Sequence, residues 1–162
     1  MVSTLAEFNT RQVQHTPYEI TASAVSYDTY QVVIHSIRHA VFVYEQSIPH
    51  SREIDSYDPI SHHVLAWYQG RAVGTGRLAP NGRIGRVAVT QSLRRQGIGQ
   101  CVMSKLMEIA QQQKHQTVFL AAQCHAIPFY EKLGFFQEGA IFNELGIQHV
   151  MMRSTLSHTN IR

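Results

Sequence analysis

Two arginines and two glycines stand close together in the middle of the chain, in the segment from Arg94 to Gly99. This segment follows Arg86-Val87-Ala88-Val89, which is typical of a buried strand, and it opens a long amphipathic stretch. A glycine-rich turn at a helix start presents free backbone N–H groups to an anion and lets a ligand approach the backbone closely. Arginine side chains add charge-assisted hydrogen bonds to phosphate oxygens. The pattern therefore predicts a phosphate-binding site, although a plain loop before a helix would share the same G-x-G spacing.

The segment differs from the two best-known phosphate-binding loops. No Gly-Lys-Ser/Thr follows, which argues against a Walker loop, and G-x-G-x-x-G is incomplete, which argues against a dinucleotide fingerprint. The 162 residues carry 14 basic and 11 acidic side chains, a net charge of +3 that is too small to indicate a nucleic-acid partner. No apolar stretch approaches the ~20 residues of a membrane span. We therefore expect neither a nucleic-acid nor a membrane partner.

A second motif lies downstream, after one expected helix and one expected strand. It comprises Gln123, Ala126 and the run from Phe129 to Phe135. Together, the two motifs resemble the GNAT superfamily of acyl-CoA-dependent N-acetyltransferases. The signatures of that family are Arg/Gln-x-x-Gly-x-Gly/Ala after a strand, and a later Asn-x-x-Ala-x-x-x-Tyr that leads into a Tyr-Glu-Lys-Leu-Gly-Phe run.

The resemblance implies a fold and a reaction. The expected fold is a single-domain mixed α/β structure, in which a mostly antiparallel sheet of six to seven strands has helices on both faces. The domain is expected over residues 18–153, between an N-terminal extension (1–17) and a C-terminal tail (154–162). The implied reaction is acetyl transfer from acetyl-CoA to a primary amine by direct attack in a ternary complex. Glu45-Gln46 and the acidic stretch from Glu53 to Asp58 further resemble the ElaA-like bacterial branch.

The resemblance also implies where the cofactor lies. The pantetheine arm is expected to pair with the backbone of a strand that splays from its neighbour, with the pyrophosphate on the amides of the glycine turn. Gln123 stands where the family usually has asparagine, and Ala126 leaves space near the thioester. The residues expected to bind acetyl-CoA are Val87, Ala88, Val89, Arg94, Arg95, Gln96, Gly97, Ile98, Gly99, Gln100, Gln123, Ala126 and Phe129.

Tyr130 matches the family's general-acid position. A phenol beside the thioester sulfur can donate a proton or a hydrogen bond to the departing thiolate. The alternative is a core tyrosine that packs between Phe129 and Phe135.

The general base is open. Many relatives have a glutamate on the strand before the glycine turn, but Arg83 to Arg86 contains no carboxylate. Glu45, Asp55, Glu144 and His149 are candidates for the base or for binding the acceptor, and a water chain is a further route for the proton. If these carboxylates line the cleft, they favour a positively charged small-molecule or peptide amine.

Histidines and cysteines offer little further chemistry. His35 and His39 are spaced i, i+4 on an expected helix, but no third ligand or second shell is evident, so we expect no metal. Cys101 and Cys124 lack C-x-x-C spacing and, with no signal peptide in the sequence, indicate a reduced, cytoplasmic setting.

Periodicity and turn residues predict the elements that must position these groups. A strand is expected at 18–25, followed by a helix that begins at Ser26 or Asp28 and buries one face. That face contains Val33, Ile37, Val41 and Tyr44. Residues 45–61 read as loop, and Asn81-Gly82 as a hairpin turn. Further strands are expected at 64–68, 72–78, 84–89, 117–122, 138–145 and 147–153, and further helices at 99–113 and 126–133.

Two other functions remain open on the sequence. One is a non-catalytic acyl-CoA-binding sensor or partner-binding module, because the strand glutamate is missing. The other is a nucleotide-binding protein, which the missing Walker lysine weakens. The oligomeric state is expected to be a monomer or a homodimer.

Overall fold

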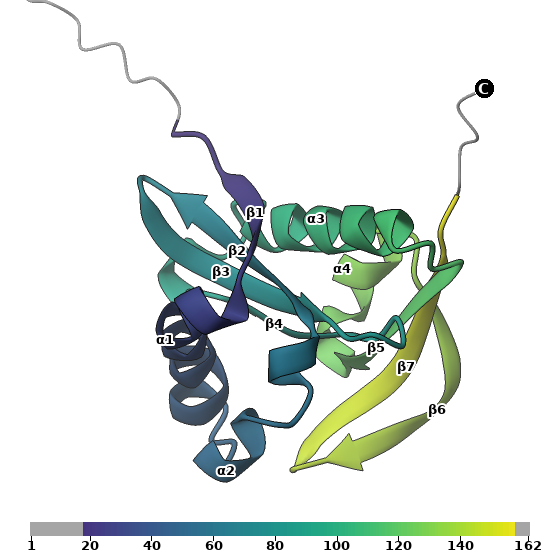
Figure 1. Cartoon of the computed structure of the whole chain (residues 1–162). Coiled ribbons are helices and arrows are strands. Elements are labelled where there is room, and N and C mark those ends of the chain that lie inside the picture. Colours follow the sequence, from purple (N-terminus) through teal and green to yellow (C-terminus); the bar gives the residue numbers. More distant parts are fainter. Residues whose placement is uncertain (1–17, 158–162) are drawn as a thin grey trace, which may run out of the picture.

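The computed structural model describes residues 18–157 and arranges them as two antiparallel sheets with helices around them (Figure 1). The extension 1–17 and residues 158–162 lie outside the described residues. The first sheet has the order β1-β2-β3-β4 and the second the order β5-β7-β6. Their bounds are Thr21–Val25 (β1), His62–Tyr68 (β2), Arg71–Leu78 (β3), Ile84–Val89 (β4), Thr117–Gln123 (β5), Phe136–Glu144 (β6) and Ile147–Thr155 (β7).

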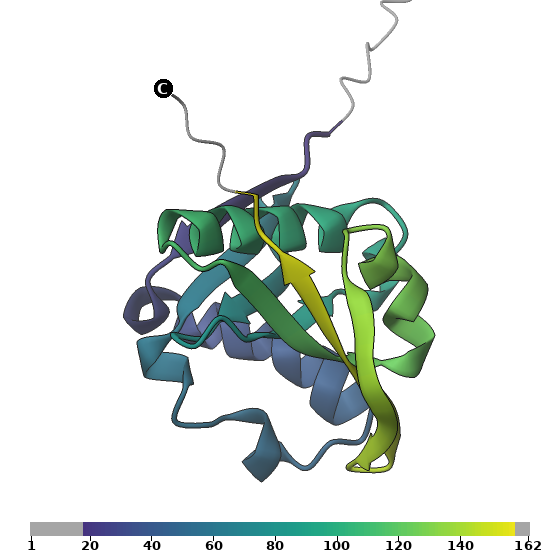
Figure 2. The same cartoon turned by 90° about the vertical axis from the view of Figure 1, so that its right-hand side faces the viewer.

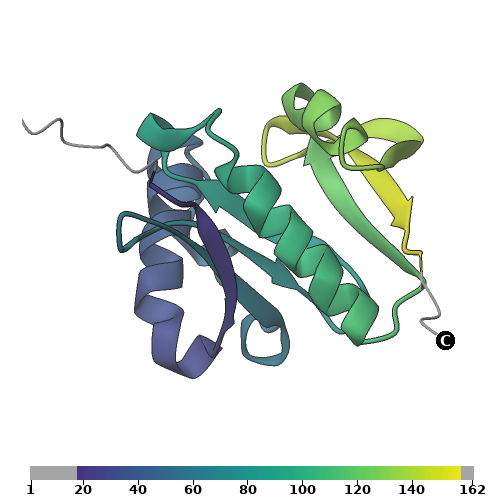
Figure 3. The ribbon, with the colours of Figure 1, turned by 90° about the horizontal axis from the view of Figure 1, so that it is seen from above.

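Helices cover both faces of the first sheet, as expected. The main elements are α1 (Tyr27–Arg38), the π-helical turn η1 (His39–Glu45), α2 (His50–Glu53), α3 (Ile98–Gln112) and α4 (Ile127–Glu131). Three short 3₁₀ turns span Asp58–Ile60, Gln91–Leu93 and Cys124–Ala126. Val64 and Ala66 of β2 pack in the cluster that contains α3, whereas Leu65 packs with α1. Successive side chains of a strand point to opposite faces, so α1 and α3 lie on opposite sides of the sheet (Figure 3).

The two sheets separate between β4 and β5. A single parallel bridge joins Arg83 to Phe119 at the start of the two strands. Beyond it, β4 pairs only with β3, and β5 only with β7, among residues 18–157. The connection through α3 makes β4 and β5 parallel, as the sequence predicts. The β5-β7-β6 sheet faces the viewer in Figure 2. The edge of β4 that faces β5 therefore has no strand partner over its second half.

Helix α3 lies very close to the first sheet because two residues of β3 have no side chain. A Cβ atom on Gly74 would lie 2.8 Å from Ile98 Cγ2. One on Gly76 would lie 2.8 Å from both Leu106 Cδ1 and Val102 Cγ1. The glycines of β3 thus set the distance between α3 and the sheet, and with it the position of the turn at the start of α3.

The first helix differs from its expected face. Ile34, Ile37 and Val41 are buried, but Val33 is only half-buried and Tyr44 is 81% exposed. The cause is η1, where the backbone widens to i→i+5 bonds such as Gln46 N–H to the Val41 carbonyl (3.0 Å). The wider turn rotates the residues that follow it around the helix axis. A prediction based on the α-helical period therefore places Tyr44 on the buried face, whereas its side chain is exposed.

Other boundaries move by a few residues. The first strand begins at Thr21, later than expected, and the expected 45–61 loop contains α2. Strand β7 extends to Thr155, and Leu156 is buried with its N–H bonded to the Gln116 carbonyl (2.8 Å). The last strand and the packing that follows it thus continue past residue 153.

Candidate active site

A cleft of about 930 Å³ opens where the two sheets separate. Its walls come from four regions: β4, the end of η1 with the segment that follows it, the end of β5 with α4, and the β6–β7 hairpin. Of the residues singled out in the sequence, those that line it are Glu45, Asp55, Val87, Ala88, Val89, Arg94, Gln123, Ala126, Tyr130, Glu144 and His149. The glycine turn and Phe129 lie outside this lining, and Arg94 connects the turn to it.

The glycine turn has the geometry expected of an anion site. Gly97 caps α3 with a φ of +87°, and a Cβ on it would meet no atom within 4 Å. A Cβ on Gly99 would lie 3.3 Å from the Phe129 ring, so Gly99 allows α3 to pack against α4. The side chain of Ile98 is buried, so only its backbone can face a ligand. The side chains of Arg95, Gln96 and Gln100 are exposed. The first N–H groups of α3 therefore face an accessible space.

Arg94 is ion-paired with Glu45 in this structure. Its Nη1 and Nη2 donate to the two carboxylate oxygens at 2.5 and 2.6 Å, and its Nε donates to the Val89 carbonyl at 3.1 Å. The Arg94 hydrogen bonds lower the pKa of Glu45, and the same pairing raises the pKa of Arg94. A carboxylate held in this way is a poor proton acceptor, which disfavours Glu45 as the base.

Gln46, next to Glu45, is hydrogen-bonded to Gln123 at the end of β5. Its Nε2 donates to Gln123 Oε1 (3.2 Å), and Gln123 Nε2 donates back to Gln46 Oε1 (2.9 Å). Glu45-Gln46 thus links the end of η1 both to the turn before α3 and to the end of β5. Gln123 holds the position expected from its motif, but its side-chain amide already has a protein partner.

Asp55 is also neutralised. Arg77 donates to both of its oxygens at 2.6 Å, and Arg86 Nη2 donates at 3.0 Å. Burial on its own would raise the pKa of Asp55, but the hydrogen bonds and charge of Arg77, with the charge of Arg86, lower it. Asp55 is therefore no better suited than Glu45 to accept a proton or a cationic group.

His149 and Glu144 lie on the β6–β7 hairpin and keep their functional groups less engaged. His149 is buried, stacks on Phe142 at 5.7 Å, and has Nδ1 2.8 Å from the Ile147 carbonyl. A carbonyl only accepts, so Nδ1 carries the proton and the lone pair of the neutral ring is on Nε2. Glu144 is exposed and forms no ion pair within the described part of the chain.

Tyr130 lies on α4 with its ring in an aromatic cluster. Its ring centroid is 5.0 Å from that of Phe129 and 5.9 Å from that of Phe135, both edge-on. Burial raises the pKa of Tyr130 to about 12. The tyrosine is at once a core residue and a cleft residue, so the two readings of the sequence do not exclude each other. Its hydroxyl keeps its proton at neutral pH and can act as a donor.

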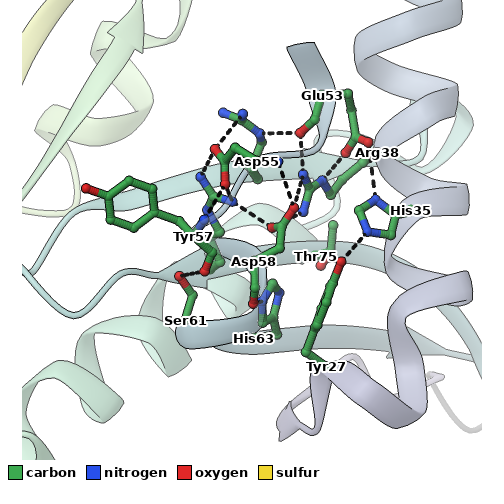
Figure 4. Close-up of polar contacts among 12 residues, drawn as sticks. Tyr27, His35, Arg38, Glu53, Asp55, Tyr57, Asp58, Ser61, His63 and Thr75 are labelled. Carbon is green, nitrogen blue, oxygen red and sulfur yellow. Dashed lines mark hydrogen bonds and ion pairs between the residues drawn. The ribbon is translucent and has the colours of Figure 1, made fainter. Parts of the chain in front are cut away.

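A buried ionic network lies next to the wall of the cleft (Figure 4). The sequence analysis did not predict this network. Arg38 and Asp58 are fully buried and paired through Arg38 Nη1 and Asp58 Oδ1 at 2.7 Å. Arg77 Nη1 reaches the same oxygen at 2.6 Å, and Glu53 pairs with Arg38. The available signal was Arg38 itself, a charged residue one position after Ile37 on the buried face of a predicted helix.

None of the helices described between residues 18 and 157 is long and apolar enough to cross a membrane.

Comparison with known proteins places this geometry in a family. Residues 39–156 match the model of the acetyltransferase (GNAT) domain. A Bacillus subtilis protein named as an acetyltransferase is 37% identical, with 72% of this chain and 83% of that protein covered. Protein ElaA of Escherichia coli is 34% identical, with 72% and 81% covered.

Solved structures give the same answer. The crystal structure of Escherichia coli ElaA matches with a TM-score of 0.75 and 29% identity, covering 84% of this chain and 99% of that one. A GNAT family acetyltransferase of Elizabethkingia anophelis, solved with acetyl-CoA bound, shares the fold at a TM-score of 0.64 and 17% identity, covering 85% and 98%. The resemblance seen in the two sequence motifs is confirmed, including its ElaA-like part. Since the family match spans most of the chain and relatives more than 30% identical cover over two thirds of it, the protein belongs to the GNAT acetyltransferase family.

Proposed function

We propose that this protein transfers the acetyl group of acetyl-CoA to a primary amine by direct attack in a ternary complex. The observation that carries the proposal is the edge of β4 without a strand partner, which lines the same cleft as Tyr130 and ends close to the turn that opens α3. Acetyl-CoA-dependent N-acetylation is the general reaction of the family. The acceptor class and the residue roles below are inferred from the cleft.

The cofactor fits this path by chemistry. Pantetheine contains two amides, which an unpaired strand edge can bond as a further strand would. The pyrophosphate would lie on the first N–H groups of α3, where the macrodipole favours negative charge. Arg94 would then donate to a phosphate oxygen, either in place of Glu45 or in addition to it. The side chains of Val87 and Val89 pack against the core, so only their backbone groups are used.

The reaction requires a nucleophile, a leaving group and a route for one proton. The neutral amine nitrogen attacks the thioester carbonyl carbon and forms the C–N bond. The C–S bond then breaks, and its electron pair leaves on sulfur while the nitrogen loses a proton. The Tyr130 hydroxyl, with a pKa of about 12, is a weaker acid than an ordinary thiol of about 8.5, so it stabilises the thiolate by a hydrogen bond and keeps its own proton.

His149 is the base that we favour. It lines the cleft, and its Nδ1–H is fixed by the Ile147 carbonyl, which leaves Nε2 to accept the amine proton. Glu45 and Asp55 are held as paired carboxylates, and we assign Glu144, which has no such partner among the described residues, to binding the acceptor.

The acceptor follows from the charges of the cleft. Four carboxylates line the cleft. Glu45, Glu53 and Asp55 are already paired with arginines, and only Glu144 has no such partner among the described residues. We therefore propose a small-molecule or peptide acceptor with a single amine rather than a polyamine.

The test is release of free CoA from acetyl-CoA with a panel of amines that includes amino acids, amino sugars, peptide N-termini and polyamines. We expect turnover with monoamines and a weaker response to polyamines. Acetyl-CoA is also expected to raise the melting temperature more than ATP or NAD at equal concentration, because it binds the native state. Stabilisation by acetyl-CoA without turnover on any amine would instead favour a non-catalytic acyl-CoA sensor.

A further inference from the structure

A cluster of metal-ligand type lies beside the cleft and takes no part in the proposed reaction. His35 and His39, one helical turn apart across the α1–η1 junction, converge on Glu53 of α2. Glu53 Oε2 lies 3.2 Å from His35 Nδ1 and 3.3 Å from His39 Nε2. The ligand atoms of all three residues lie within 4.8 Å of one another. Figure 4 shows the contact between His35 and the Glu53 carboxylate at one side of the network.

The two separations from Glu53 Oε2 are close to the edge of a tetrahedral metal site. Zn²⁺ binds imidazole nitrogen and carboxylate oxygen at about 2.0–2.2 Å, so two ligand atoms of a tetrahedron lie about 3.3–3.5 Å apart. The distances from Glu53 Oε2, 3.3 Å to His39 Nε2 and 3.2 Å to His35 Nδ1, lie at or just below the lower end of this range. Two imidazoles and one carboxylate form a common three-residue zinc set that leaves the fourth position to water.

The ligands are also oriented by outer partners. The Tyr27 hydroxyl lies 2.8 Å from His35 Nε2, so a metal on Nδ1 would leave Nε2–H to donate to Tyr27. Arg38 holds the other carboxylate oxygen of Glu53, which directs Oε2 toward the histidines. Such outer hydrogen bonds are typical of ligating histidines and carboxylates.

His39 supplies the second observation. Its Nε2 is buried, and it makes no hydrogen bond among residues 18–157, because its contact with Glu53 lacks the required geometry. A buried polar atom without a hydrogen bond is costly, and a metal ion would satisfy it. The neighbouring charge of Arg38 opposes a cation, but Asp58 is paired with the same guanidinium.

We propose that His35, His39 and Glu53 bind one Zn²⁺ ion with water as the fourth ligand. The ion would hold α2 against the α1–η1 junction. This matters to the cleft because Arg52, Glu53, Ile54 and Asp55 form part of its wall. The proposal departs from the expectation of no metal, which rested on the missing third ligand, and it does not depend on the proposed catalysis.

The experiment is calorimetric titration of Zn²⁺ into the tag-free, chelator-treated full chain. We expect one ion per chain and a chelator-reversible rise in melting temperature. His39→Phe keeps a ring of similar size and is expected to abolish the site. Tyr27→Phe is expected to weaken binding by about 10–100-fold, as loss of an outer partner does. His115→Phe, which removes a half-buried histidine between α3 and β5, is the matched control and should bind as the wild type does.

Two further measurements keep the result unambiguous. Circular dichroism checks that each variant is folded, and Glu53→Gln removes the carboxylate charge at nearly constant volume. Co²⁺ in place of Zn²⁺ should give the visible absorption of a tetrahedral ion, and this band should vanish in His39→Phe. The absence of saturable Zn²⁺ binding, or equal affinity in the His39→Phe and His115→Phe variants, would overturn the proposal.

Discussion

At the residue scale, the Tyr130 hydroxyl is the group that the proposed chemistry depends on most. Tyr130→Phe keeps the ring in its cluster with Phe129 and Phe135 and removes one hydrogen-bond donor. Loss of a single donor to a developing anion typically costs about 10²–10³-fold in kcat, so we expect a loss of that order with little change in acetyl-CoA affinity. Steady-state kinetics on an active amine measure it. Wild-type kcat for the variant across acceptors would remove Tyr130 from the mechanism.

His149 gives a second residue-scale prediction. His149→Gln retains a polar side chain but has no titratable nitrogen, so kcat/KM should fall by about 10²–10⁴-fold, the usual contribution of a general base. His125→Gln is the control, because His125 also lines the cleft but is exposed and lies on a different element. Equal effects of the two substitutions would mean that the proton leaves through water instead.

At the element scale, the start of α3 and the edge of β4 work together. The glycines of β3 let α3 lie close to the sheet, and the separation of β4 from β5 opens the edge beside it. In the proposed function neither element would bind acetyl-CoA alone, because one would supply N–H groups for the pyrophosphate and the other a strand edge for the amides.

The Gly97 turn can be tested with an isosteric pair. Gly97 has a φ of +87°, so a β-branched residue would strain the backbone, whereas Asn and Asp tolerate this region best. Either side chain would enter the open space over the α3 amides. We expect Gly97→Asn to weaken acetyl-CoA binding and Gly97→Asp to weaken it further by about tenfold or more, because the carboxylate repels the pyrophosphate. Calorimetry compares the two, and equal affinities would contradict an anion site at this turn.

At the scale of the whole molecule, the network around Asp58 joins α1, β3 and the cleft wall. Arg38 comes from α1 and Arg77 from β3, and both donate to Asp58 in the 3₁₀ turn between α2 and β2. Burial would raise the pKa of Asp58, but the two arginines outweigh it and lower the pKa to about 2.

This shift predicts acid destabilisation. A carboxyl group with a lowered native pKa stabilises the fold above its unfolded pKa near 3.8, and this contribution disappears as pH falls toward 2. A change of that size corresponds to about 2 kcal/mol of unfolding free energy. Asp58→Asn should cost about 3–5 kcal/mol at neutral pH and flatten the pH dependence in that window. Urea unfolding from about pH 6 to pH 2 tests this, with the exposed Asp28→Asn as control. A steep acid limb that persists in Asp58→Asn would assign it to other carboxylates.

The sequence by itself determined the order of the elements and the two motifs. Strand β4 was predicted with its observed bounds, and α3 to within one residue at each end, because alternation and helical periodicity are local properties of the chain. The glycine turn and the run around Tyr130 were recognised by their resemblance to the motifs of the family, and the family is confirmed.

Only the tertiary structure decided which charged groups are free. Glu45 and Asp55 were equal candidates with Glu144 and His149 until Arg94, Arg77 and Arg86 were found paired with the first two. Glu45 and Arg94 are 49 positions apart, and a sequence without a fold gives no distance between such residues. Glu53 reaches His35 and His39 for the same reason, because α2 folds back onto the α1–η1 junction. Charge neutralisation and metal coordination depend on separations of a few ångströms, and these are set by how the elements pack.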